Sequence, residues 1–282
     1  MAEHPGSRRL FPTDPLPPGT RIACRIEYDG SAYHGWQAQP QPGARTVQQT
    51  LEVALTEIAA APLRVHCAGR TDSGVHGHAQ VIHFDAPTAR SCKAWVVGTN
   101  SQLPPDIRVH WAQPVPADFH ARFSALARRY RYLIADTAIR PALLGRQLSW
   151  QRLPLDAERM HSAAQCLLGE RDFSAFRAAS CQSSTPFRYV SHCDVSRRGE
   201  LLVIDIQANA FLHHMVRNIA GSLMAVGSGS REPTWIADLL AGRDRTLAAE
   251  TAPAEGLYLV DVLYPERFGL PATPPGPLLL TV

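Results

Sequence analysis

The sequence predicts an α+β fold built on a mostly antiparallel mixed sheet with helices on one side. Segments of strand and helix character alternate along the chain, and short turns join several neighbouring strands as in hairpins. This alternation occurs twice, which predicts two similar halves, over residues 20–115 and 116–265, with a cleft between them. We expect a disordered proline-rich extension over residues 1–19 and an irregular proline-rich tail over residues 266–282.

The first half is expected to contain four strands and two helices. The strands are expected at residues 21–30, 63–68, 79–86 and 107–115. The first helix begins after Thr46, which forms a capping-box pattern with Gln49 and precedes apolar residues at helical spacing. The second helix is short and is expected over residues 92–104.

The second half repeats this succession loosely. Strands are expected over residues 127–136 and 256–264, and a hairpin over residues 187–209 with its turn near Gly199. One helix is expected to start at Asp156, which can act as its cap. These elements give the second half the same mixture of strands and helices as the first.

The composition limits the class of protein. Hydrophobic residues make up 45% of the 282 residues, enough to bury a core, and a net charge of +3 is compatible with binding nucleic acid. No run of 18 apolar residues occurs, which argues against a membrane span. The six cysteines contain no C-x-x-C pair and suit a reducing compartment, so we expect a cytoplasmic location. Lys93 is the only lysine, so lysine-based catalysis would depend on that residue alone.

The stretch GRTDSGVH, at residues 69–76, places Asp72 in a glycine-framed turn between two strands. One interpretation is a hairpin turn with a capping aspartate. Aspartic proteases also use a DSG triplet, but they need a second such aspartate, and the chain has no second copy. A glycosidase needs two carboxylates, and only Asp85 is near in sequence. The third interpretation is a lone carboxylate nucleophile, kept ionised by Arg70 on the same face of an extended backbone.

Basic and aromatic residues alternate in FHARFSALARRYRYLI, at residues 119–134. This pattern is typical of RNA binding, with arginines on phosphates and rings beneath unstacked bases. In an extended strand, Tyr130 and Tyr132 point to one face and Arg129 and Arg131 to the other. The alternative is a strand with a buried tyrosine and solvated arginines.

The apolar segment over residues 211–227 is predicted to be a helix that carries three basic side chains. His213 and Arg217 would share one face, and a buried arginine there needs a partner. The adjacent His213 and His214 raise the question of a metal site. On a helix, however, neighbouring rings point apart, and no cysteine, aspartate or glutamate nearby completes a ligand set, so we expect no metal.

Five segments resemble the tRNA pseudouridine synthase A (TruA) family. In chain order they are YDGSAYHGWQAQP, GRTDSGVH, HARFSALARRYRYLI, FSAFRAASCQS and NAFLHHMVRNIAGSL. The resemblance covers roughly residues 20–265 and leaves the N-terminal extension outside the family core. Gly77 is a small departure, since alanine often follows the histidine of the second segment. The resemblance implies two pseudo-symmetric, ferredoxin-like halves that flank a central catalytic cleft.

The resemblance also implies an activity and a site. The family isomerises uridine to pseudouridine on the 3′ side of the tRNA anticodon stem-loop, at positions 38–40, as a homodimer and without cofactor or metal. Asp72 matches the catalytic aspartate, and Arg70 matches the arginine that organises its loop. Tyr130 matches the tyrosine that packs on the target base, and Arg217 matches the basic residue that pairs with the carboxylate. Whether the aspartate attacks the base or the ribose stays open.

Two alternatives from other classes also stay open. One is a non-catalytic RNA-binding protein of the same fold, and the other is an aspartic protease-like hydrolase. The intact GRTD sequence, Tyr130 and Arg217 favour the synthase. Release of tritium from C5-labelled uridine in tRNA would separate the three hypotheses.

Overall fold

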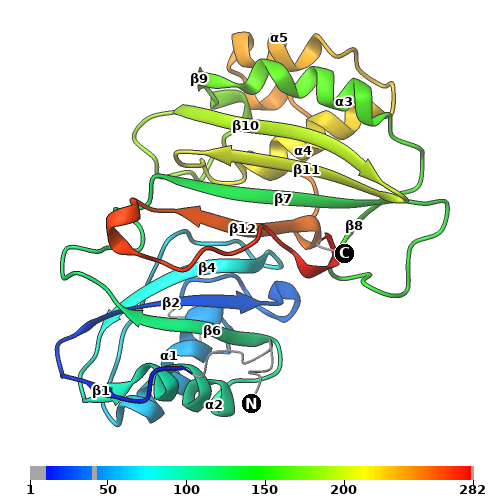
Figure 1. The fold of residues 1–282 in the computed structure, drawn as a ribbon. Coiled ribbons are helices and arrows are strands. Elements are labelled where there is room, and N and C mark those ends of the chain that lie inside the picture. Colours follow the sequence, from blue (N-terminus) through cyan, green and yellow to red (C-terminus); the bar gives the residue numbers. More distant parts are fainter. Residues whose placement is uncertain (1–10, 40–42, 281–282) are drawn as a thin grey trace, which may run out of the picture.

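The computed structural model describes residues 11–39 and 43–280, and ten of their strands form one large sheet (Figure 1). In chain order these strands are β2 (Arg21–Tyr28), β3 (His66–Cys67), β4 (His76–Asp85), β6 (Ile107–Pro114), β7 (Ala127–Asp136), β8 (Ser149–Gln151), β9 (Gly169–Asp172), β10 (Phe187–Arg198), β11 (Leu201–Ala208) and β12 (Leu257–Leu263). The main path runs β6-β2-β4-β12-β7-β11-β10-β9, with β3 beside β4 and β8 beside β7. All these pairings are antiparallel except β4–β12 and β7–β8, so the predicted mostly antiparallel sheet is confirmed.

Two of the five described helices, α1 (Val47–Ala59) and α3 (Ala157–Ala164), begin at a residue whose side chain caps the helix. The other three are α2 (Thr99–Gln102), α4 (Met215–Gly227) and α5 (Trp235–Gly242), with a π-helical turn over Ala94–Gly98 just before α2. The Thr46 side chain accepts a hydrogen bond from the Gln49 N–H at 3.3 Å, and Asp156 accepts from the Arg159 N–H at 3.0 Å. Both predicted helix starts are therefore confirmed.

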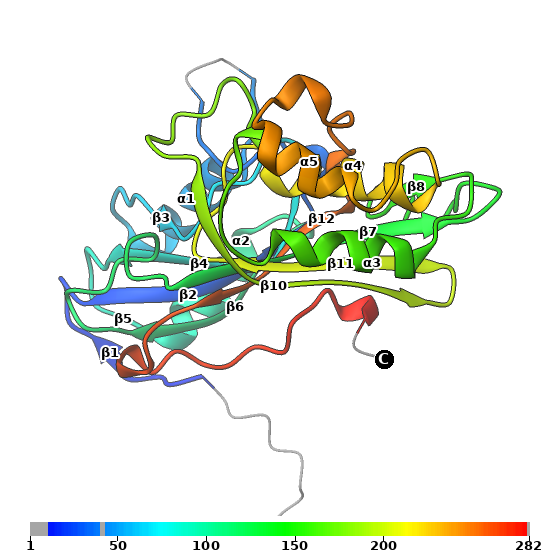
Figure 2. The same cartoon turned by 90° about the horizontal axis from the view of Figure 1, so that it is seen from above.

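Each half of the sheet has its own apolar core. In the first half, Leu51 and Leu55 of α1 pack with Ile22 of β2 and Phe84 of β4. In the second half, helices α3, α4 and α5 cover the sheet, and Ile219 and Leu223 of α4 belong to its core. Figure 2 shows these three helices on one face and the C-terminal tail on the opposite face.

Strand β12 joins the two halves. It runs parallel to β4, with Tyr258 opposite His76, and antiparallel to β7, with Leu259 opposite Tyr130. Because side chains alternate along a strand, Leu259 enters the core beneath α4, whereas Tyr258 joins a smaller cluster that includes Leu280 of the tail. The strand that comes last in the sequence therefore lies near the centre of the sheet.

The two terminal segments have more structure than predicted. Residues 1–10 of the expected extension lie outside the described residues, but β1 (Pro15–Leu16) pairs with β5 (Arg90–Ser91). The expectation of disorder is wrong for this part, because backbone pairing fixes it. The tail is mostly irregular, and the Arg131 guanidinium donates to the Pro275 and Gly276 carbonyls at 2.9 and 2.8 Å. None of the described helices is both long and apolar enough to cross a membrane.

Candidate active site

Asp72 lies in the loop between β3 and β4, just before the β4–β12 pair that joins the halves. The backbone reverses at Gly74, whose φ is +79°, and the Val75 N–H donates to the Asp72 carbonyl at 3.2 Å. The Asp72 side chain keeps 26% of its surface exposed. The carboxylate is therefore held by a turn and remains accessible to a ligand.

The segment YDGSAYHGW, residues 28–36, packs against the Asp72 loop. Buried Thr71 shares a hydrogen bond of 2.8 Å with the Tyr28 hydroxyl, and its carbonyl accepts from the Trp36 N–H at 3.0 Å. Gly35 has a φ of +84°, and a Cβ at this position would lie 2.7 Å from the Thr71 carbonyl oxygen. Only glycine fits this contact without displacing the loop.

His76, at the end of the GRTDSGVH stretch, is a scaffold residue. Its Nδ1 lies 3.1 Å from Asp29 Oδ1 and 3.1 Å from the Gly30 nitrogen. Its ring stacks on Tyr258 with centroids 4.6 Å apart, and its Nε2 contacts the Glu255 carbonyl at 3.2 Å. Burial opposes ionisation of Asp29, but hydrogen bonds led by that with His76 outweigh it and hold the Asp29 pKa well below its usual range. His76 thus ties the Asp72 loop to the second half.

Three side chains, two from the turn before α4 and one from its first turn, approach the Asp72 carboxylate. His213 Nε2 lies 3.3 Å from Oδ1, and His214 Nε2 lies 3.4 Å from Oδ2. Arg217 Nη1 lies 3.6 Å from Oδ2, while its Nε donates to the Ala252 carbonyl at 2.8 Å. Arg217 therefore faces the carboxylate with one nitrogen and does not form two parallel hydrogen bonds.

The expectation that the His213 and His214 rings point apart is wrong. Helix α4 begins at Met215, four residues later than predicted, and His214 has a φ of +61°. In this turn the two ring centroids lie 4.0 Å apart and both Nε2 atoms face Asp72. The missing acidic ligand is Asp72, which is distant in sequence. Burial lowers the pKa of His214, although the Asp72 charge opposes this shift.

The segment over residues 173–183 holds the His213 turn in place. The Ala178 N–H donates to the His213 carbonyl at 3.0 Å, and the His213 N–H donates to the Cys181 sulfur at 3.4 Å. The Ser180 hydroxyl lies 3.0 Å from His213 Nδ1. These contacts leave His213 Nε2 directed at the carboxylate.

Tyr130 lies on β7, close to the loop that carries Asp72. It is buried, with 8% of its surface exposed, and it meets Phe211 edge-on at a centroid distance of 5.1 Å. Its hydroxyl lies 3.6 Å from the position of a Cβ at Gly69. Burial raises the pKa of Tyr130 well above its usual range. The phenol is therefore neutral and close to the Asp72 loop.

Comparison with known proteins identifies the family. A family profile described as tRNA pseudouridine synthase matches residues 25–124 and 163–265. The tRNA pseudouridine synthase A of Citrobacter koseri is 59% identical over 264 residues, which cover 94% of this chain and 97% of that protein. That of Enterobacter sp. strain 638 is 60% identical over 265 residues, with the same coverage. The chain belongs to the tRNA pseudouridine synthase family.

A solved chain from a Cbf5–Nop10–Gar1 complex also aligns with this pseudouridine synthase. The TM-score is 0.28 at 12% identity, and the alignment covers 72% of this chain and 54% of the other. A similarity of this size supports no conclusion about the fold or the site.

Arg70 is not brought to the Asp72 carboxylate. Its side chain is exposed, and within residues 11–39 and 43–280 it has no hydrogen bond or ion pair. The chain enters a turn at Ser73 and Gly74, directly after Asp72, and no ion pair joins Arg70 to Asp72 among the described residues. Any role of Arg70 in this pseudouridine synthase would therefore depend on contact with a substrate.

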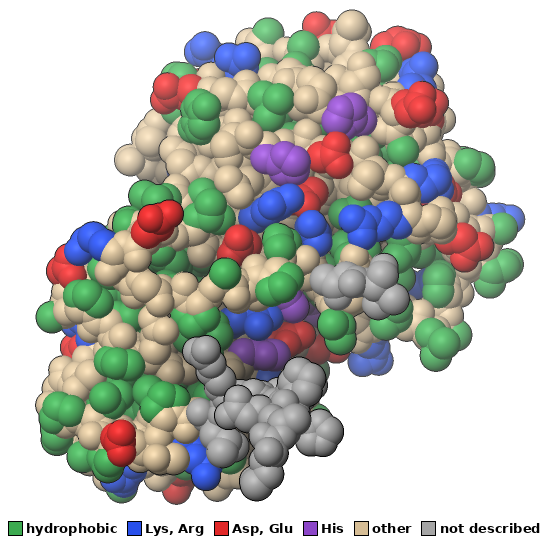
Figure 3. Space-filling view, viewed as in Figure 1, with side chains coloured by type: hydrophobic (Ala, Val, Ile, Leu, Met, Phe, Trp, Pro, Cys, Tyr) green, Lys and Arg blue, Asp and Glu red, His purple; other side chains and the backbone are tan. Residues whose placement is uncertain are grey.

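The arginines beside Tyr130 do not form a row of phosphate contacts. Arg129 and Arg131 both pair with Asp205, at 2.6 and 2.8 Å, on the face that carries the tail. Arg128 donates to the Ala68 carbonyl at 2.9 Å and so fixes the loop. Both arginines therefore have a partner within the protein, and RNA binding by them stays a prediction. Figure 3 shows acidic, basic and histidine side chains intermixed on this face, opposite α4.

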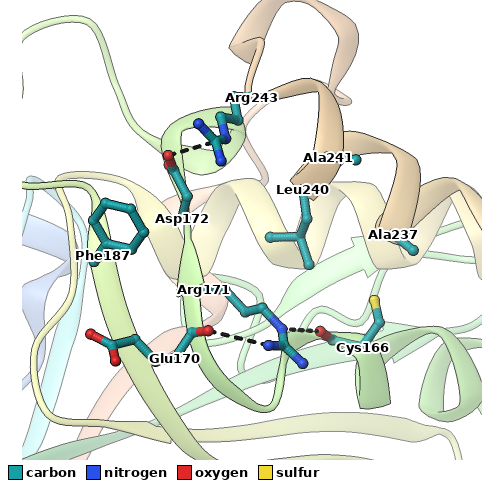
Figure 4. A pocket seen from close by; sticks show the side chains of 9 residues that line it. All are labelled: Cys166, Glu170, Arg171, Asp172, Phe187, Ala237, Leu240, Ala241 and Arg243. Carbon is teal, nitrogen blue, oxygen red and sulfur yellow. Dashed lines mark hydrogen bonds and ion pairs between the residues drawn. The ribbon is translucent and has the colours of Figure 1, made fainter.

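A separate hollow of about 480 Å³ lies between α5 and β9 (Figure 4). Arg243 pairs with Asp172 at 3.3 Å across it, and Arg171 donates to the Cys166 carbonyl at 3.4 Å. Arg243, Asp172 and Arg171 thus already have partners within the protein. Asp72 and its neighbours are not among the lining residues, so this hollow is not the candidate active site.

Proposed function

We propose that this pseudouridine synthase isomerises uridine in the anticodon stem-loop of tRNA, with Asp72 as its nucleophile. The names of the curated relatives support tRNA as the substrate, and the family resemblance supports the anticodon region. The observation that carries the catalytic assignment is the approach of His213, His214 and Arg217 to one accessible carboxylate. Accessible carboxylates surrounded by such groups are common at catalytic sites.

The reaction exchanges one bond of uracil for another without adding or removing atoms. The bond between N1 and the ribose C1′ breaks, the base turns over, and C5 bonds to C1′. The proton on C5 is lost, and N1 gains one. Asp72 forms a transient covalent bond with either the base or C1′, and both routes require an ionised carboxylate.

The neighbouring residues have distinct proposed roles. The positive charge of Arg217 favours the ionised carboxylate, and its bond to Ala252 fixes its position. Tyr130 packs against a base that has left its stack. The solvent-exposed side chain of Arg70 contacts the RNA around the target nucleotide.

Tritium release from C5-labelled uridine in tRNA tests this function. The synthase should release tritium and leave pseudouridine, and the Asp72→Asn variant should bind the same tRNA without release. Binding without release by the wild-type protein would instead indicate a non-catalytic RNA-binding protein. Cleavage of peptides with no tritium release would indicate the hydrolase.

We also propose a homodimer that works in the cytoplasm, where tRNA is available. The loop between β7 and β8 supports a partner surface, because Ile139 and Leu143 are 80% and 85% exposed. Replacement of both by aspartate should yield a monomer in light scattering after size exclusion. A wild-type protein that is monomeric at micromolar concentration would contradict this proposal.

A further inference from the structure

The side chains of Asp72, His213 and His214 have the geometry of a metal site. One ligand atom from each can be chosen so that all three lie within 4.8 Å of one another. The two histidines face different oxygens of the carboxylate, with His213 Nε2 at 3.3 Å from Oδ1 and His214 Nε2 at 3.4 Å from Oδ2. Tetrahedral ligands bound to Zn²⁺ at about 2.0–2.1 Å lie about 3.3–3.4 Å apart. Each histidine already lies at this distance from one carboxylate oxygen, and small side-chain rotations would bring one atom from each residue around a single ion.

We propose that Asp72, His213 and His214 bind one divalent transition-metal ion of the Zn²⁺ type, and that the bound ion inhibits the enzyme. A carboxylate coordinated to metal has its electron pair engaged, so it cannot serve as a nucleophile until the ion leaves. Three protein ligands leave a fourth position for water. The site would make the activity sensitive to the level of free zinc.

The ligand set determines which ions compete for the site. Two imidazoles and one carboxylate suit Zn²⁺, Co²⁺ and Ni²⁺, whereas Mg²⁺ prefers oxygen ligands and keeps several of its waters. Magnesium at the concentrations that tRNA needs should therefore leave the site free. This difference separates a specific effect from a general effect of divalent ions on RNA.

The surroundings support coordination through Nε2 of His213. Its Nδ1 already contacts the Ser180 hydroxyl at 3.0 Å, and its backbone is held through Ala178 and Cys181. A partner on the second ring nitrogen is the usual way in which proteins orient a ligating histidine. The 173–183 segment thus supplies the outer support that a metal site needs.

Arg217 opposes the ion and provides a further test. Its Nη1 lies 3.6 Å from Oδ2 of Asp72, so a metal ion and the guanidinium compete for one carboxylate. The bond to the Ala252 carbonyl restrains Arg217 from moving away. Zinc should consequently bind more tightly to the Arg217→Met variant than to the wild type.

Metal binding can be tested independently of activity in the tRNA-free, full-length protein. Isothermal titration calorimetry measures binding of Zn²⁺, and visible absorption measures binding of Co²⁺. We expect one ion per chain and a Kd raised at least about tenfold in each of the His213→Gln, His214→Gln and Asp72→Asn variants, since loss of even an outer-shell partner costs about 10–100-fold. His110→Gln is the matched control, because His110 also contacts a carboxylate, that of Glu27. Circular dichroism confirms that each variant is folded. No saturable binding, or a Kd unchanged by all three site variants, would overturn the proposal.

The inhibition rests on the proposed role of Asp72, so it is measured separately. Single-turnover tritium release should fall as Zn²⁺ reaches the measured Kd, recover with a chelator and remain unchanged with Mg²⁺. Inhibition is expressed relative to the metal-free rate of each variant. Zinc that binds to Asp72 while turnover stays full would overturn the inhibition. Turnover by metal-free Asp72→Asn would instead refute the nucleophile assignment and leave the binding result standing.

Discussion

The Asp72 carboxylate faces basic side chains on one side and solvent on the other, which makes it the residue most sensitive to substitution. Asp72→Asn should lower turnover by at least about 10⁴-fold, as loss of a nucleophile does in other enzymes. The affinity for tRNA should change little, because a single neutral substitution leaves the phosphate contacts in place. Single-turnover rates and filter binding measure the two effects. Asp118→Asn, at an exposed ion pair with Arg267, is the control and should retain full activity.

Arg217 connects two fixed points, the Ala252 carbonyl and the Asp72 carboxylate. Lysine has one ammonium group and cannot contact both from a fixed fork, so Arg217→Lys should keep only part of the rate. Arg217→Met should lose about 10²–10³-fold, the usual cost of removing one donor from a catalytic site. Rates under single-turnover conditions check this order. Equal rates for the two variants would show that the charge of residue 217 does not affect catalysis. The control is Arg267→Met, which removes an exposed arginine elsewhere on the protein.

At the scale of elements, the loop that carries Gly35 positions the loop that carries Asp72. Gly35→Ala introduces a Cβ 2.7 Å from the Thr71 carbonyl, and misplacement of a catalytic group by about 1 Å can cost about 100-fold in rate. Gly19→Ala is a matched control, because Gly19 has a φ of +83° but no atom within 4 Å of its Cβ position. It should lose about 1–2 kcal/mol of stability through backbone strain alone. Denaturant unfolding and tritium release together measure both effects, and a fully active Gly35→Ala would contradict this view of the loop.

The sequence predicted most elements, since their signals are local. Thr46 and Asp156 marked helix starts because capping depends on residues only three positions apart. The start of α4 was misplaced because its apolar pattern continues through His213 and His214, while contacts from the distant 173–183 segment hold these residues outside the helix. Likewise, no local pattern reveals that Asp205 occupies Arg129 and Arg131. The family resemblance predicted that Arg217 pairs with Asp72. The approach of His213 and His214 to the same carboxylate depends on the three-dimensional fold and has no local signal in the sequence.

For the whole molecule, buried histidine chemistry predicts a dependence of stability on pH. Burial, with the neighbouring His120 and His66, lowers the pKa of His83 to about 4, from an ordinary value of about 6.5. Between these values the unfolded chain binds a proton that folded His83 does not, so the free energy of unfolding should fall as pH falls from 6.5 towards 4. Above pH 6.5 this contribution is constant.

Denaturant titrations between pH 6.5 and 5 (a window chosen to avoid carboxylate protonation,) test this dependence. The His83→Gln variant should show a shallower slope, because glutamine can still accept from the Ala121 N–H but does not titrate. His192→Gln, on β10 and partly exposed, is the control. An identical slope for His83→Gln and wild type would show that His83 does not contribute.

The central place of β12 has a consequence for how the protein is made. This strand lies between β4 and β7, yet the ribosome synthesises it after every other strand of the described sheet. Until then β4 and β7 present unpaired edges, and His76 lacks Tyr258 and the Glu255 carbonyl. The two halves can each collapse during translation, but they cannot dock around Asp72. A ribosome-bound chain that stalls before residue 257 should therefore be unable to modify tRNA, which confines activity to chains that have been translated past β12.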